Sequence, residues 1–159
     1  MATEDTFSGA LQAMTFMNAY IKTVAEEIGM DQAVSLLTKM CESMGATQGK
    51  ILKEQAGDEE LDVAAAWSLV KRVPEGIGIG AEVIKESPEE IVFKTDRCPL
   101  YTAGQMLGMD NNTIETMCRN GPARLMDTIT KELNPNLSYQ LRKFRSGEDD
   151  FCEEAIIQD

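Results

Sequence analysis

Residues 76–99 read GIGIGAEVIKESPEEIVFKTDRCP, and the chain changes character within this stretch. Before it, apolar residues recur every three or four positions, which is typical of helices. Within it, two short runs rich in isoleucine, valine and phenylalanine flank the turn residues Ser87 and Pro88, so the pattern predicts a β-hairpin. Pro99 suits the first position of a following helix, with Cys98 as its cap. The stretch therefore joins helices to a sheet.

The three glycines that open this stretch could suggest a nucleotide-binding loop. However, no helix is expected directly after them, and no Gly-Lys-Ser/Thr motif follows. We interpret them instead as a bulge or a place where another part of the backbone comes close. They are Gly76, Gly78 and Gly80.

On the N-terminal side, apolar stripes predict two long helices and a shorter third one. The expected caps are Thr3 or Asp5 for the first helix and Asp31 for the second, the expected stops are Gly29 and Gly57, and the third helix is expected over 59–72. Gly45 and Gly49 lie within the second helix. Glycine weakens a helix interior, so a kink or break is expected there.

On the C-terminal side, the pattern predicts a helix from Pro99 to about Gly108 and another from Asp110 to Leu133, interrupted at Gly121-Pro122. A second hairpin would pair 137–143 with 151–157. This order predicts an α+β fold, with N-terminal helices packed on a mainly antiparallel sheet of about four strands. The sheet is built from two hairpins with two helices between them. The whole chain, 1–159, is expected to form one domain, with a helical part (1–73) and a hairpin–helix–helix–hairpin part (74–159).

Charge and composition exclude several classes of partner. Fifteen basic and 27 acidic residues give a net charge of −12, which disfavours binding to nucleic acid or to an anionic membrane surface. No run of about 18 apolar residues is present, so no membrane span is expected. The N-terminus is acidic where a signal peptide would be basic, and this favours a cytoplasmic location.

The chain has no histidine and four cysteines, which restricts the chemistry it can perform. Ser-His-Asp and Cys-His catalysis and histidine-ligated metals are excluded. In the cytoplasm, the cysteines are expected to be free thiols, metal ligands or redox groups. Cys98 is the strongest candidate nucleophile, because a helix N-terminus and the adjacent Arg97 should lower its pKa. The alternative interpretation of Cys98 is a small apolar residue at the junction of a strand and a helix. Cys41 lies on the apolar stripe of the second helix and is expected in the core.

Cys98, Cys118 and Cys152 each lie close to the end of an expected element in the C-terminal half. If they converge, three thiolates with a carboxylate or water as the fourth ligand would suit zinc. Core packing is the alternative interpretation for Cys118 and Cys152. The acids before Cys152 include Asp149, a candidate base, although a run of acids is also typical of a solvated turn.

These cysteine motifs resemble those of the L-2-amino-thiazoline-4-carboxylic acid hydrolase family and, more distantly, the 4-vinyl reductase domain. The resemblance covers about 77–157 and is carried by Arg97-Cys98-Pro99, Cys118, Asn134-Pro135-Asn136-Leu137 and the stretch from Gly147 to Cys152. It implies hydrolytic opening of a thiazoline ring. The 4-vinyl reductase resemblance implies a dimeric sensor of small hydrophobic ligands with a cysteine zinc site. The chain departs from the hydrolase pattern at Gly121, where an aspartate is expected three residues after the helix cysteine.

Three hypotheses of function follow. In the first, the protein hydrolyses a ring or an amide between sheet and helices. Cys98 and Cys152 are then candidate catalytic residues with Asp149 or Asp150 as base, or Cys98, Cys118 and Cys152 hold a metal whose bound water attacks. In the second, it is a homodimeric sensor or carrier with a methionine- and phenylalanine-lined pocket for a small molecule and a structural zinc. In the third, it is an interaction subunit of a larger enzyme system.

Overall fold

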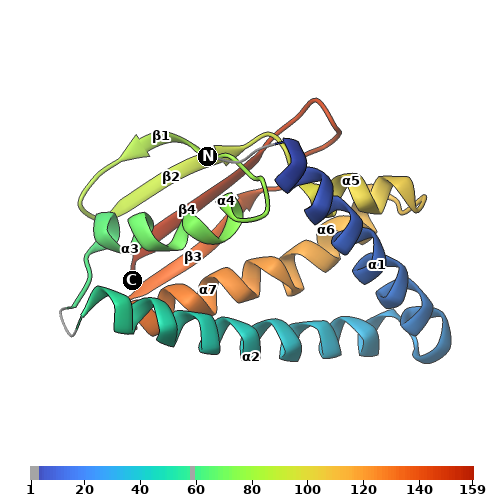
Figure 1. Ribbon diagram of the computed structural model, residues 1–159, viewed down its shortest axis with the longest axis horizontal. Helices are drawn as coiled ribbons and strands as arrows, with labels where there is room; N and C mark the ends of the chain where they lie inside the picture. Colours follow the sequence, from blue (N-terminus) through green and yellow to red (C-terminus); the bar gives the residue numbers. More distant parts are fainter. Residues whose placement is uncertain (1–3, 58–59) are drawn as a thin grey trace.

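The computed structural model describes residues 4–57 and 60–159, and its helices pack on one face of a four-stranded sheet (Figure 1). The helices are α1 (Glu4–Ile28), α2 (Met30–Ala56), α3 (Val63–Val70), α4 (Arg72–Glu75), α5 (Pro99–Met106), α6 (Asn111–Asn120) and α7 (Pro122–Leu133). The strands are β1 (Glu82–Glu86), β2 (Glu90–Thr95), β3 (Leu137–Lys143) and β4 (Cys152–Gln158). All pairings are antiparallel, in the order β1-β2-β4-β3. The predicted α+β fold is confirmed.

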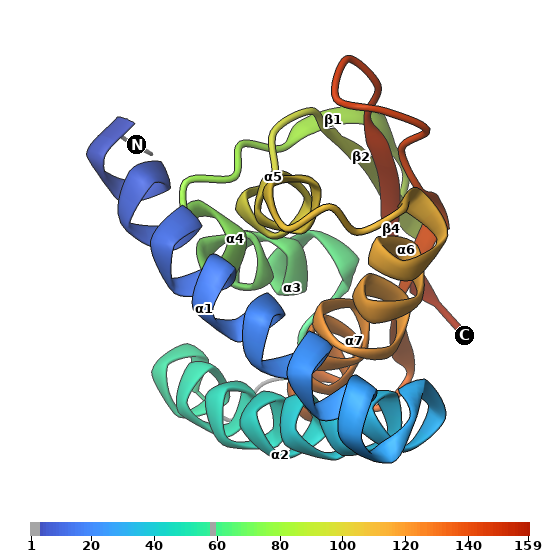
Figure 2. The same ribbon diagram turned by 90° about the vertical axis from the view of Figure 1, so that its right-hand side faces the viewer.

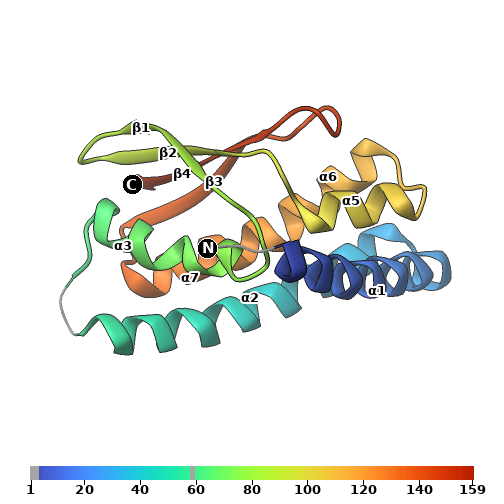
Figure 3. The same ribbon diagram turned by 45° about the horizontal axis from the view of Figure 1, so that its top comes forward.

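The elements form layers. Figures 1 and 3 show α3 and α7 beneath the sheet, and α2 on the far side of α7. Figure 2, turned by 90°, again places α7 between α2 and the strands. Figure 3 also shows α5 and α6 at one end of the sheet, below the loop that joins β3 to β4. The main core lies between the sheet and α3 and α7, where the rings of Trp67 and Phe93 stack with centroids 4.2 Å apart.

The strand register decides which side chains face the helices. Opposite residues in the ladder share a face, and successive residues alternate. Ile156 of β4 lies in the core and is paired with Ile91 and Tyr139, which lie there too. Two and four residues earlier on β4, Glu154 and Cys152 therefore face the helices as well. A carboxylate and a thiol are thus placed on the inner face of the sheet.

The expected break in α2 is wrong, because the helix runs uninterrupted from Met30 to Ala56. Gly45 and Gly49 are instead the points where α7 comes closest. A Cβ added at Gly45 would lie 2.7 Å from the Leu125 carbonyl oxygen, and one at Gly49 would lie 2.6 Å from Cβ of Glu132. The two glycines therefore allow close packing of two helices.

Several predicted boundaries also needed correction. Asp5 and Asp31 each lie within the first turn of their helix and not at its cap, and the N-cap of α2 is Gly29. The predicted stops at Gly29 and Gly57 are confirmed, since α1 ends at Ile28 and α2 at Ala56. Thr3 lies outside the described residues. The third helix begins only at Val63, where the side chain of Asp62 accepts a hydrogen bond from the Ala65 N–H (2.8 Å). The predicted break at Gly121-Pro122 is confirmed, since α6 ends at Asn120 and α7 begins at Pro122.

The glycine stretch before the first hairpin precedes the strand, because β1 begins only at Glu82. Gly78 has φ 82°, and a Cβ added to it would lie 2.9 Å from Cα of Phe7 in α1. The interpretation of a close approach of two backbone segments is therefore confirmed at this residue. Within the described part of the chain, no helix is both long enough and apolar enough to cross a membrane.

Candidate functional site

Three of the four cysteines come together at the end of the sheet that faces α5 and α6. Cys98 is the N-cap of α5, Cys118 lies in the last turns of α6, and Cys152 begins β4 opposite Thr95 of β2. Each of the three thiols interacts electrostatically with the other two. The three cysteines therefore lie in one region of the structure, and a site that they share stays a prediction.

A carboxylate and a phenol that the sequence did not indicate complete this group. Glu154 faces inward from β4, Tyr139 from β3 is its hydrogen-bond partner, and the Thr95 hydroxyl lies 3.4 Å from its Oε2. Cys118 interacts electrostatically with both Glu154 and Tyr139. We call Cys98, Cys118, Cys152, Tyr139 and Glu154 the thiol–carboxylate cluster. Only the alternation along β4, two residues after Cys152, could have revealed Glu154.

Burial raises the pKa of Glu154 above its ordinary value, and hydrogen bonds from Tyr139 and Thr95 oppose this shift only in part. In the described part of the chain, no lysine or arginine nitrogen lies within 4.0 Å of its carboxylate. Burial also raises the pKa of Tyr139 well above its usual range. The inner face of the sheet thus holds a carboxyl group that can gain or lose a proton closer to neutral pH than an exposed one can.

Arg145 supplies the positive charge of this region. Its side chain is only 2% exposed, and its two Nη atoms donate to the carbonyl oxygens of Thr95 (2.9 Å) and Asp96 (3.0 Å). The guanidinium lies over the Tyr101 ring, 5.1 Å from its centroid. Its charge lowers the pKa values of Cys98 and Glu154, but by less than burial raises them. The hydrogen bonds of Arg145 therefore connect the loop after β3 to the end of β2.

The prediction of a low pKa for Cys98 is wrong, because burial raises the pKa of this thiol. The backbone groups of Tyr101 and Leu100 at the start of α5 do lower it, but by less. Arg97 contributes nothing, since it pairs with Glu4 at 2.9 Å and lies over the Phe7 ring at 3.6 Å. Burial also raises the pKa of Cys118 well above its usual range. At rest these two thiols are protonated and poorly nucleophilic.

Cys41 is a core residue, as one interpretation of the sequence held. It is 5% exposed and packs with Ile21, Leu37 and Met117. Burial raises its pKa to about 11.

The acids before Cys152 form a turn and do not join the cluster. Asp150 accepts hydrogen bonds from the Ser146 N–H and hydroxyl, both at 2.9 Å, and pairs with Lys143 at 2.6 Å. These partners hold the pKa of Asp150 below its ordinary value, the Lys143 hydrogen bond most of all. Asp149 is exposed beside it. The structure therefore does not bring Asp149, the predicted base, to the thiols.

Two further observations concern the metal hypothesis and the family pattern. Across residues 4–57 and 60–159, no three or more Cys, Asp or Glu side chains are arranged so that they could hold a metal ion. Zinc at the three cysteines stays a prediction. At Gly121, an added Cβ would lie 2.8 Å from the Met117 carbonyl oxygen. The helix break thus leaves no space for the aspartate that the family pattern has at this position.

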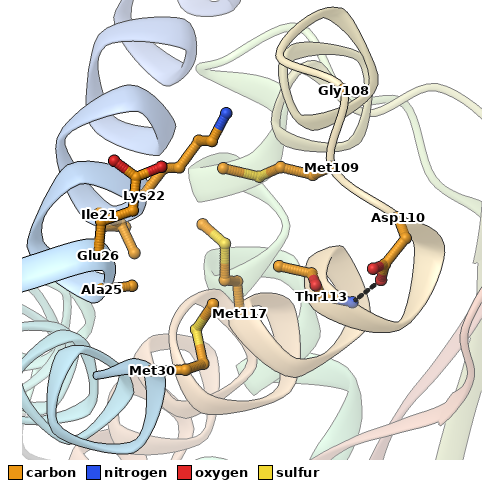
Figure 4. Close-up of a pocket in the computed structure, with 10 residues that line it drawn as sticks. All are labelled: Ile21, Lys22, Ala25, Glu26, Met30, Gly108, Met109, Asp110, Thr113 and Met117. Atoms are coloured by element: carbon orange, nitrogen blue, oxygen red, sulfur yellow. Dashed lines mark hydrogen bonds between the residues drawn. The ribbon is translucent and has the colours of Figure 1, made fainter.

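Two pockets open to the surface. The smaller, about 150 Å³, is lined by Arg119, Ala123, Arg124, Asp127, Tyr139 and Leu141. It shares Tyr139 with the cluster and is lined by residues of β3, α6 and α7. The larger, about 320 Å³, lies between α1, α6 and the loop before α6 (Figure 4). It contains methionines, as the sequence suggested, but no phenylalanine, and no strand residue lines it.

Comparisons with known proteins support the resemblance. The family model described as L-2-amino-thiazoline-4-carboxylic acid hydrolase matches residues 9–152. No curated protein sequence matched the chain. Among solved structures, the chain is similar to trafficking protein particle complex subunit 3 from Naegleria fowleri, which is described as covalently bound to palmitic acid. The TM-score is 0.63 at 15% sequence identity, and the match covers 92% of this chain and 95% of the other. At this identity the likeness shows the fold alone.

Proposed function

Because the chain belongs to the L-2-amino-thiazoline-4-carboxylic acid hydrolase family, we propose that it binds a small molecule beside the thiol–carboxylate cluster and opens it by hydrolysis. The observation that carries this proposal is Glu154. It is an inward-facing carboxyl group with a raised pKa, a phenol partner and no ion pair in the described chain. A carboxyl group tuned upward by burial is suited to general acid–base catalysis near neutral pH.

In the proposed reaction, water adds to the carbon of a C=N bond in the substrate, and the Glu154 carboxylate takes the proton that the water loses. Protonated Glu154 passes this proton to the former imine nitrogen, which gives a tetrahedral intermediate with a new hydroxyl group. The hydroxyl then becomes a carbonyl as the carbon–nitrogen or carbon–sulfur bond to the leaving atom breaks, and Glu154 carries the hydroxyl proton to that leaving atom. Tyr139 donates a hydrogen bond that orients the carboxylate. Substrate would enter through the smaller pocket, which Tyr139 borders.

The candidates from the sequence take secondary roles in this proposal. Cys98 could act as a nucleophile only after a neighbouring base removes its proton, because burial raises its pKa. A zinc ion held by Cys98, Cys118 and Cys152 would supply an activated water in place of direct deprotonation by Glu154, provided the thiols move closer to one another. Metal analysis of protein purified without chelator tests that alternative.

Turnover of L-2-amino-thiazoline-4-carboxylate tests the proposal directly. Glu154→Gln keeps the shape of the side chain but removes the acid, so kcat should fall by about 10²-fold or more. Asp149→Asn is the matched control, since it removes an exposed acid from the nearby turn, and it should leave kcat unchanged. Full activity in Glu154→Gln would refute the role of Glu154. Loss of activity in Cys98→Ala alone would assign the chemistry to the thiol.

A second candidate function is binding without catalysis, as a sensor or carrier. The raised pKa values of Cys98 and Cys118 favour it, because thiols that stay protonated suit the lining of a binding site. The similar solved structure is described as holding palmitic acid, so an apolar ligand is compatible with such a fold. We expect this form to be a cytoplasmic homodimer that pairs through exposed apolar side chains of the first two helices, including Phe16, Tyr20, Leu36 and Met40. Binding of substrate without turnover would favour this candidate.

A further inference from the structure

The larger pocket is separate from the thiol–carboxylate cluster and shares no residue with it. Its buried floor is formed by Ile21 of α1 and Met117 of α6. Figure 4 shows Met109 from the loop before α6, Met117 and Met30 at the start of α2 directing their thioether ends to the same space. A volume of about 320 Å³ is in the range of small-molecule sites. Thioether side chains adapt to apolar groups of different shape. We call this space the methionine pocket.

One wall of the methionine pocket carries a cation and an anion side by side. Lys22 and Glu26 are four residues apart on α1, so they project from the same face of the helix. Both are exposed, and no ion pair to either is found among residues 4–57 and 60–159. Their charged groups therefore stand apart at the edge of an apolar space, each able to take a partner.

The opposite wall carries one charged group, the Asp110 carboxylate, which is engaged in capping a helix. Asp110 is the N-cap of α6, and its Oδ1 accepts a hydrogen bond from the Thr113 N–H at 2.8 Å. Figure 4 shows Asp110 and Thr113 on the far side of the pocket from Lys22 and Glu26. Apart from this capping carboxylate, the charged groups that a ligand in the methionine pocket would meet are those of Lys22 and Glu26, both on α1.

We propose that the methionine pocket binds a free α-amino acid with an apolar side chain. Its carboxylate would pair with Lys22, its ammonium group with Glu26, and its side chain would contact Met30, Met109 and Met117. A ligand with only a carboxylate would meet the repulsion of Glu26, and one with only an amine would meet that of Lys22. A zwitterion satisfies both charges, and the apolar floor selects a hydrophobic side chain.

The binding test uses the full chain labelled with ¹³C at the methionine methyl groups, with each signal assigned by a Met→Leu variant. Addition of L-leucine should shift the methyl signals of Met30, Met109 and Met117 in a saturable manner. Met44 lies fourteen residues beyond Met30 on α2, about 21 Å along the helix axis, and its signal should not move. Two analogues, 4-methylpentanoic acid and 3-methylbutylamine, each lack one charge and should bind about tenfold more weakly.

Two charge variants test the assignment of the groups. Lys22→Met should weaken L-leucine binding about tenfold, and Glu26→Gln should make L-leucine and 4-methylpentanoic acid bind alike. Lys50→Met and Glu54→Gln are matched controls, because these residues are also exposed, four apart and without an ion pair in the described chain. Absence of saturable shifts, wild-type binding of either analogue as tight as that of L-leucine, or equal effects in the control variants would each overturn the proposal.

Discussion

The two glycines of α2 that face α7 make a sharp test of how these helices pack. Gly45→Ala would place a Cβ 2.7 Å from the Leu125 carbonyl oxygen and 2.9 Å from Cβ of Thr128. Gly49→Ala would place one 2.6 Å from Cβ of Glu132 and 3.2 Å from Cα of Ile129. All four distances are to backbone or Cβ atoms, and three of them are 2.9 Å or less. Such atoms cannot move away unless the helix itself moves. Each substitution should therefore separate α2 from α7.

Two opposing effects set how far each substitution lowers the free energy of unfolding. Replacing glycine by alanine inside a helix stabilises it by about 0.5–1 kcal/mol. Overpacking at a tight contact costs about 1–3 kcal/mol. The net loss at Gly45 or Gly49 should be about 1–2 kcal/mol. For 159 residues, an unfolding entropy of about 2.1 cal/mol/K per residue converts this to a fall in Tm of about 3–6 °C.

Gly9→Ala is the matched control. Gly9 also lies inside a helix, α1, but nothing lies within 4 Å of an added Cβ. This substitution should raise Tm by about 2 °C, because only the helix propensity changes. Thermal unfolding followed by circular dichroism, checked by urea denaturation, measures all three variants. A shift in the same direction for Gly9→Ala and Gly45→Ala would refute the close helix contact.

Three further predictions concern the interior of the site. Because burial raises the pKa of Glu154 above its unfolded value, the native state binds the extra proton. Relative to Glu154→Gln, the wild type should then lose stability as pH rises from about 4.5 through the folded pKa. Urea unfolding midpoints of both proteins across this pH range measure the effect, and a difference in midpoint that does not change with pH would contradict the raised pKa. Native Cys98 and Cys118 should react with a disulfide reagent at pH 8 at least about tenfold more slowly than the urea-unfolded chain, because their raised pKa values keep the thiols protonated, and equal rates would contradict these pKa shifts. Arg145→Met should lower the free energy of unfolding by about 2–4 kcal/mol, since it leaves the Thr95 and Asp96 carbonyls without their donor, and a loss below 1 kcal/mol would contradict that role.

Periodicity was sufficient to predict the element order and the α+β class. The break at Gly121-Pro122 and the two hairpins follow from local chemistry, which is readable in a single chain. The shape of the second helix could not be predicted in this way. Propensity indicated a weak point at Gly45 and Gly49, whereas the structure uses both glycines for a contact with α7, about 80 residues further along. Contacts of that kind override local preference, and the sequence does not display them.

Of the candidate site, only the three cysteines could be predicted from the sequence. Cysteine is a rare residue type, and three of the four lie at the ends of elements, which makes Cys98, Cys118 and Cys152 recognisable as site candidates. Glu154 belongs to a run of ordinary acids, and its inward direction depends on the register of β4 against β2 and β3. The pKa of Cys98 was predicted with the wrong sign. The helix N-terminus was correctly identified, but the burial that outweighs it arises from tertiary packing.

The outer edge of the sheet has a consequence for how the protein can associate. All five residues of β1 are exposed, three of them are charged, and the register shifts between Val83 and Lys85. An edge strand with free backbone groups is a template on which a second chain can add its own strand. The charges and the irregular register of β1 work against such strand addition, and so against growth of the sheet into fibrils. The exposed apolar residues of α1 and α2, by contrast, lie on the helical side of the molecule.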